Sequence, residues 1–103
     1  MKYVVSWTFR LNGSMAENEA AVKRIQAVCS KWTSPAGTRY HQFLIKADSS
    51  GGYAVIETDK SADLAETTAK FGVFAEYRVD PVLDVADALA LAQVGIEFRE
   101  SIS

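Results

Sequence analysis

The sequence has little cysteine, histidine and proline. It holds one cysteine, one histidine and two prolines among 103 residues. A single cysteine excludes a disulfide within the chain and favours a reducing compartment. Cys29 and His41 are also too few to form a closed zinc site in one chain. We therefore expect a cytoplasmic protein that needs neither a metal nor a bound cofactor.

Long apolar runs and clusters of basic residues are also missing. The apolar N-terminal run ends at Arg10, which is too short for a membrane span or for a signal peptide with its cleavage site. The net charge is −2, and Lys23 and Arg24 are the only adjacent basic residues. Binding to phosphate backbones needs clustered positive charge. We therefore expect neither nucleic acid nor a membrane as a partner.

What is present is typical of a globular protein. Hydrophobic residues make up 49% of the chain and charged residues 23%. A chain of 103 residues matches the common size of one domain. We therefore expect a single domain over residues 1–103.

The pattern predicts alternating strands and helices. Runs of β-branched and aromatic residues predict strands at 2–9, 39–47, 53–58 and 73–80. Ser14 and Glu17 match a capping box, which begins a helix that runs to about Trp32. The other helices are predicted from Asp59 or Ser61 to Phe71–Gly72, and from Asp84 to about Val94 with a break at Gly95.

The order of these elements is βαββαβ with one more helix. It predicts an α+β fold of ferredoxin-like kind, in which a four-stranded antiparallel sheet has two helices on one face. The strand at 2–9 carries little charge on either side. Two helices on one face leave the other face of the sheet uncovered, so we expect a second copy of the chain to cover that face, as a homodimer.

The sequence is similar to the dimeric α/β-barrel superfamily, and within it to a family of small uncharacterised bacterial proteins. The segments that carry this resemblance are Lys2–Trp7, Gly52–Thr58 and Asp80–Val85. The resemblance implies two ferredoxin-like protomers that pack sheet to sheet around a cavity. Members include small monooxygenases, polyketide cyclases, haem-handling proteins and sensors, so it does not imply one reaction. The single histidine argues against a mechanism that needs two.

The hairpin around residues 48–52 carries the most reactive pair of side chains. A five-residue loop pairs Ala47 with Tyr53 and turns His41, Phe43 and Glu57 to one face. The Glu57 carboxylate then orients the imidazole of His41 as a general base. A four-residue loop would send the two side chains to opposite faces. The simpler alternative is that His41 lies in water at a strand end while Glu57 faces a lysine.

Further candidates are mainly apolar and aromatic, as in most ligand sites. The ligand-binding candidates are Tyr3, Trp7, Phe9, Phe43, Tyr53, Val55 and Arg78. Each has a structural alternative: the aromatic residues could pack at the dimer interface, and Arg78 could form an interface ion pair. Trp32 lies on the apolar stripe of the first helix and is expected in the core.

Two functional hypotheses follow. The first is a homodimeric cavity protein that binds a small apolar organic molecule and acts on it by proton transfer, as a cyclase or isomerase, or by cofactor-free oxygenation, with His41 as the base. The second is a non-catalytic sensor or assembly module with a packed interior. Haem bound through His41 is a remote third alternative.

Overall fold

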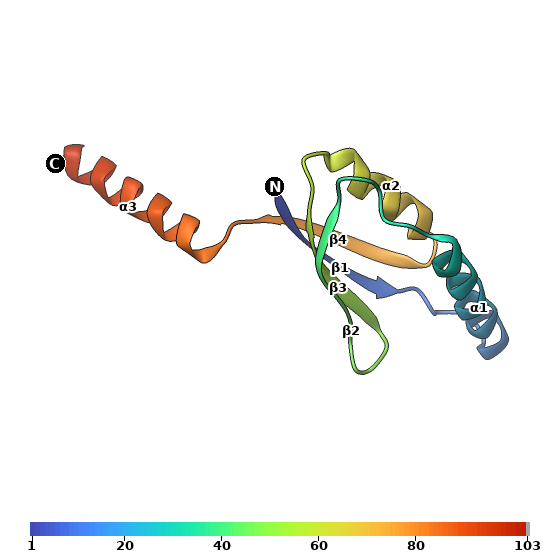
Figure 1. The fold of residues 1–103 in the computed structure, drawn as a ribbon. Helices are drawn as coiled ribbons and strands as arrows, with labels where there is room; N and C mark the ends of the chain where they lie inside the picture. The colour runs from blue at the N-terminus through green and yellow to red at the C-terminus, as the bar shows by residue number, and fades with distance from the viewer. Residues whose placement is uncertain (103) are drawn as a thin grey trace.

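A computed structural model describes residues 1–102 of the chain, which form four strands and three helices (Figure 1). The elements are β1 (Lys2–Phe9), α1 (Met15–Lys31), β2 (Arg39–Ile45), β3 (Gly51–Glu57), α2 (Ser61–Phe71), β4 (Ala75–Val82) and α3 (Val85–Ile102). All neighbouring strands are antiparallel, in the order β2-β3-β1-β4. This is the predicted ferredoxin-like order with an additional C-terminal helix.

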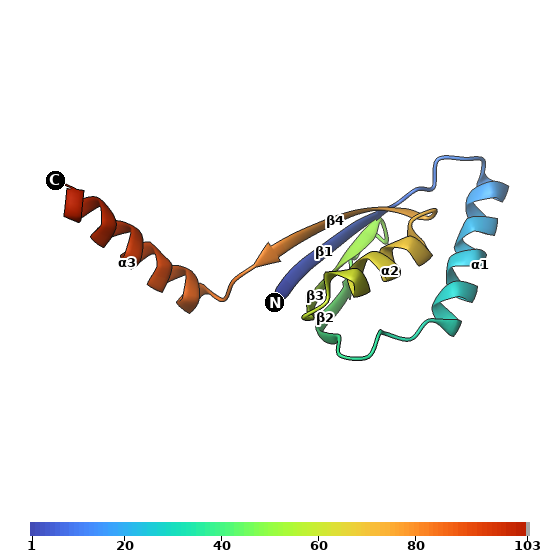
Figure 2. The same cartoon turned by 90° about the horizontal axis from the view of Figure 1, so that it is seen from above.

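The two helices α1 and α2 lie on the same face of the sheet (Figure 2). The predicted capping box begins α1, since the Ser14 hydroxyl accepts a hydrogen bond from the backbone of Glu17 and the Glu17 carboxylate accepts one from the backbone of Ser14. The helix α2 ends at Phe71, as predicted. Gly72 follows with φ −64° and ψ −22°, in the right-handed helical region. The positive φ that glycine permits is therefore not used at this helix end.

Several predicted boundaries are wrong. The strand β2 ends two residues earlier than predicted, and β3 covers Gly51–Glu57 instead of residues 53–58. The strand β4 begins and ends two residues later than predicted and includes Pro81, which an edge strand tolerates because one of its sides has no partner strand. The helix α3 does not break at Gly95 and continues to Ile102. A glycine inside a helix costs only about 1 kcal/mol relative to alanine, and the strong helix formers Leu91, Ala92 and Glu97 lie within four residues of this one.

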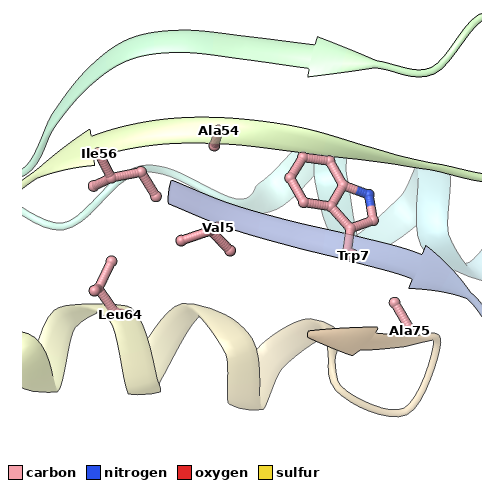
Figure 3. Packing of buried hydrophobic residues seen from close by; sticks show 6 residues of the cluster. All are labelled: Val5, Trp7, Ala54, Ile56, Leu64 and Ala75. Atoms are coloured by element: carbon pink, nitrogen blue, oxygen red, sulfur yellow. The ribbon is translucent and has the colours of Figure 1, made fainter. Parts of the chain in front are cut away.

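The core lies between the sheet and α2 (Figure 3). Its buried members are Val5, Trp7, Ala54, Ile56, Leu64 and Ala75. Gly52 pairs with Trp7 across β1 and β3, and a Cβ atom at Gly52 would collide with the Trp7 ring. The glycine predicted as part of a turn therefore lies in a strand, where it makes room for the largest core side chain.

The helix α3 extends away from the rest of the molecule (Figures 1 and 2). The molecule measures 65 × 29 × 21 Å, and its radius of gyration is 18.4 Å. A compact domain of this length has a radius of gyration of about 13 Å. No residue of α3 is buried. Within residues 1–102, no helix has the length and apolar character that crossing a membrane requires.

Candidate functional site

An apolar cavity of about 210 Å³ lies between the sheet and the helices α1 and α2. Its lining residues are Val5, Trp7, Phe9, Ile25, Cys29, Trp32, Tyr40, Phe43, Ile45, Ala54, Ile56, Leu64, Thr67, Thr68, Phe71 and Tyr77. The cavity exists because α1 stands off from the sheet, with none of its own residues buried. The interior of this protomer is therefore not packed shut.

Aromatic rings form most of the cavity wall. The Trp7 ring lies 5.6 Å from Phe43 and 6.2 Å from Tyr77, measured between ring centroids. Tyr40 stacks on Phe43 at 5.4 Å and meets Trp32 edge to face at 5.7 Å. Such contacts hold aromatic side chains in fixed orientations. The aromatic rings of the cavity wall therefore hold one another in place.

Few polar groups accompany these rings. Burial raises the pKa of the Tyr77 phenol to about 12, with smaller contributions from Cys29 and Tyr40. Burial also raises the pKa of Tyr40, which a hydrogen bond with Thr67 partly offsets. Both phenols are therefore neutral at pH 7 and can donate hydrogen bonds. The indole nitrogen of Trp32 is buried and has no hydrogen-bond partner among residues 1–102.

The structure divides the predicted ligand-binding residues between the two faces of the sheet. Trp7, Phe9 and Phe43 line the cavity. Tyr3 lies on the same side but outside the cavity, where its hydroxyl contacts the sulfur of Met1 at 3.4 Å. The remaining three lie on the opposite face, which the helices leave uncovered: Tyr53, Val55 and Arg78. The seven residues therefore do not form one site.

His41 and Glu57 do meet, although the predicted hairpin register is wrong. The loop has four residues, since the backbone nitrogen of Lys46 donates to the carbonyl of Gly51, and Phe43 pairs with Ala54 rather than with Glu57. A four-residue loop alone would separate the histidine from the glutamate. A β-bulge at His41, between Tyr40 and Gln42, reverses the alternation. As a result, Nε2 of His41 lies 2.7 Å from Oε1 of Glu57.

This pair lies on the open face of the sheet, outside the apolar cavity. The hydrogen bond from His41 lowers the pKa of Glu57, and Lys2 lowers it slightly further. Nearby, Nζ of Lys2 lies 2.8 Å from Oδ1 of Asp84, which lowers the pKa of Asp84 and raises that of Lys2. The Asp84 carboxylate, just before α3, therefore forms an ion pair. These groups form a compact charged cluster at the start of α3.

Neither a metal nor haem is suggested by these groups. Within the described residues, no three histidine, cysteine, aspartate or glutamate side chains come together as a metal site would require. His41 does not line the cavity, so it does not fit the role of an axial haem ligand there.

Sequence reasoning missed several cavity residues: Cys29, Trp32, Tyr40, Phe71 and Tyr77. Strand alternation contained the signal for Tyr77, because it faces the same side as its partner Trp7. For Tyr40 the signal was hidden, since the bulge places Tyr40 and Phe43 on one side although three positions separate them.

A family model described as "Domain of unknown function (DUF3303)" matches residues 1–96. The match includes all four strands, both cavity helices and most of α3, and the chain belongs to this family. Among curated proteins, no match to the chain is found.

Proposed function

We propose that this member of the DUF3303 family is a homodimeric protein that binds a small apolar organic molecule in the cavity between its sheet and its helices. The observation that carries the proposal is the cavity itself, with aromatic walls and a few isolated hydrogen-bond donors. Ligand sites in proteins have this composition, in which apolar walls supply affinity and a few polar groups fix orientation. The volume of about 210 Å³ favours a ligand smaller than most drug molecules.

The donors indicate where a polar atom of the ligand would bind. The phenols of Tyr77 and Tyr40 stay protonated, and the Trp32 nitrogen is buried without a partner. A buried donor without a partner costs about 1–3 kcal/mol. A ligand oxygen that accepts one of these hydrogen bonds would recover part of that cost. The cavity therefore favours an apolar molecule with one acceptor group over a pure hydrocarbon.

The open face of the sheet supports the homodimer. It exposes Leu44 and Tyr53 and leaves Val4 and Val55 only half-buried. In the proposed arrangement two sheets pack face to face and the edge strands β2 and β4 of opposite protomers meet. An eight-stranded barrel of this kind leaves no exposed sheet edge, which is otherwise a site of uncontrolled association.

The pair of His41 and Glu57 supports a second candidate function, proton transfer on a molecule that binds at the open face of the sheet. The Glu57 carboxylate accepts a hydrogen bond from the N–H at Nε2 of His41. This tautomer leaves Nδ1 unprotonated, so that Nδ1 can take a proton from a substrate carbon or oxygen. Because the pair lies on the open face, its substrate would reside between the two sheets of the dimer.

Filling the cavity tests the binding proposal. Thr68 faces the cavity from α2, whereas the next residue, Ala69, is exposed. We expect Thr68→Phe to abolish the binding of indole and 2-naphthol, measured by quenching of tryptophan fluorescence, and Ala69→Phe to leave it unchanged. Equal binding by both variants, or no binding by the unmodified protein, would contradict the proposal.

Replacing His41 tests the catalytic candidate. Once turnover of a substrate is found, His41→Ala should lower kcat by about 10²-fold or more, as expected for a general base. Unchanged turnover would remove His41 from the mechanism and leave the binding role intact.

A further inference from the structure

The helix α3 is rich in apolar side chains, but none of them is buried against another part of the protein. Its large side chains are 40–74% exposed, and the best-aligned of them recur every three or four residues: Leu91, Val94, Phe98 and Ile102. Its polar side is narrow, where the Gln93 amide donates to the Glu97 carboxylate at 3.3 Å. A helix that is apolar on most sides is normally buried. Because α3 points away from its own domain, the covering surface belongs to another molecule.

The cavity, in turn, lacks a wall. Phe43 and Ile45 of β2 line it, yet each is 55% exposed. On the other side of this opening, α1 has an apolar stripe that includes Ile25 and no buried residue. The same chain thus has an apolar helix, α3, that no surface covers, and an apolar cavity opening between β2 and α1 that no helix covers.

We propose that α3 packs across the cavity opening of a second copy of this chain, between β2 and α1, so that each ligand cavity is completed by the partner. This inference rests on the proposed function, and it names the element through which the two copies join. In the proposed barrel, β4 of one copy meets β2 of the other. The helix that follows β4 then starts at a seam shared with β2 of its partner, the strand that carries the exposed Phe43 and Ile45.

The two segments that would meet carry opposite net charge. Residues 84–102 carry four carboxylates and one cation, Arg99. Residues 20–31 of α1 carry three cations and no carboxylate. Complementary charge favours the correct partner and orientation more than it adds affinity. The opposite net charges of α3 and of residues 20–31 therefore favour the approach of the arm to this part of the partner.

The area also suits a reciprocal exchange. A helix of 18 residues is about 27 Å long and 10 Å wide, with a side wall of about 850 Å². Covering half of each arm buries about 420 Å² on the arm and a similar area on the surface that receives it. Each copy contributes one arm and one receiving surface, for a total of about 850 Å². Stable interfaces bury about 800 Å² per partner.

Disulfide trapping tests this docking, because Cys29 lines the cavity on α1 and is the only cysteine. We expect Leu91→Cys to form a disulfide with Cys29 of the other chain, seen as a dimer band on a non-reducing gel. The matched variant Gln93→Cys, on the polar side of α3, should trap at least tenfold more slowly. Adding Cys29→Ser to Leu91→Cys should remove the band.

Light scattering supplies a second readout that needs no ligand. The expected mass is twice 11.3 kDa, and Leu91→Glu with Phe98→Glu should raise the dimer dissociation constant at least tenfold over Gln93→Glu. A dimer that forms no disulfide through Cys29 would overturn the docking of α3 and leave the proposed homodimer standing. A disulfide within one chain would also overturn the docking on the partner, whereas a monomer would overturn both the docking and the homodimer.

Discussion

The two faces of the sheet are built from different chemistry. The face toward the helices gathers aromatic rings around a cavity, whereas the open face carries the ion pairs Lys2–Asp84 and Arg78–Asp80 and the hydrogen-bonded pair His41–Glu57. Exposed ion pairs contribute about 0–1 kcal/mol each, far less than a buried aromatic side chain. The helix face therefore supplies most of the stability.

The largest expected effect separates these faces directly. Trp7→Ala should lower the free energy of unfolding by about 3–5 kcal/mol, because the ring is 8% exposed and its removal leaves a cavity. Tyr53→Ala, on the open face at 44% exposure, should cost about 1 kcal/mol or less. Urea denaturation measures both. Equal losses would show that the faces do not differ as described. If Trp7→Ala does not fold, Trp7→Phe provides the same comparison with a smaller loss of stability, because it removes fewer buried atoms.

A smaller effect concerns the space under Trp7. Gly52→Ala should destabilise the protein by about 1–3 kcal/mol, because the added methyl group collides with the Trp7 ring and the Leu44 carbonyl. Gly95→Ala in α3 is the control and should stabilise the helix by up to about 1 kcal/mol, since only the flexible end of Arg99 is near. Urea denaturation midpoints should move in opposite directions. A tolerated Gly52→Ala would mean that Trp7 is not packed as described.

A third prediction uses the titration of Tyr77. Its folded pKa is about 12, above the ordinary value of 10, so its contribution to stability is complete below pH 10 and is lost as the pH rises towards 12. Ultraviolet titration of the phenols should show a late-ionising group that Tyr77→Phe removes. An unchanged titration curve in that variant would place Tyr77 in water instead of in the cavity.

The smallest expected effect concerns the open face. Glu57 has a lowered folded pKa, so the stability it contributes is present above about pH 4.5 and is lost as the pH falls through the folded value. Glu57→Gln should therefore be less stable than the unmodified protein at pH 7, and this difference should shrink by pH 3. Urea midpoints at the two pH values measure the change. A constant difference would mean that the contact with His41 does not affect the carboxylate.

The sequence predicts local features better than relative placement. The capping box of Ser14 and Glu17 depends on four adjacent residues, and the structure contains it as predicted. The contact between His41 and Glu57 depends on both the loop length and a bulge, and sequence alternation carries no information about the bulge. The predicted contact between His41 and Glu57 is present only because the shorter loop and the bulge shift the register in ways that cancel.

The cavity and the extended α3 illustrate a second limit. Apolar side chains at helical spacing on α1 predicted a packed core, but only the three-dimensional arrangement shows that α1 stands off from the sheet. Likewise, Gly95 is a weak helix breaker, and its neighbours decided the outcome. The position of α1 and the extent of α3 depend on the balance of several contacts between distant residues, and one sequence does not reveal that balance.

Nuclear magnetic resonance tests the central claim, that the helix face binds a small apolar molecule, most directly. On titration with indole, the signals of the Trp7 and Trp32 side chains should shift, and so should the methyl signals of Leu64 and Ile56. Signals of Val55 and Val4 on the open face should stay in place. Shifts confined to the open face, or none at saturating indole, would contradict the account.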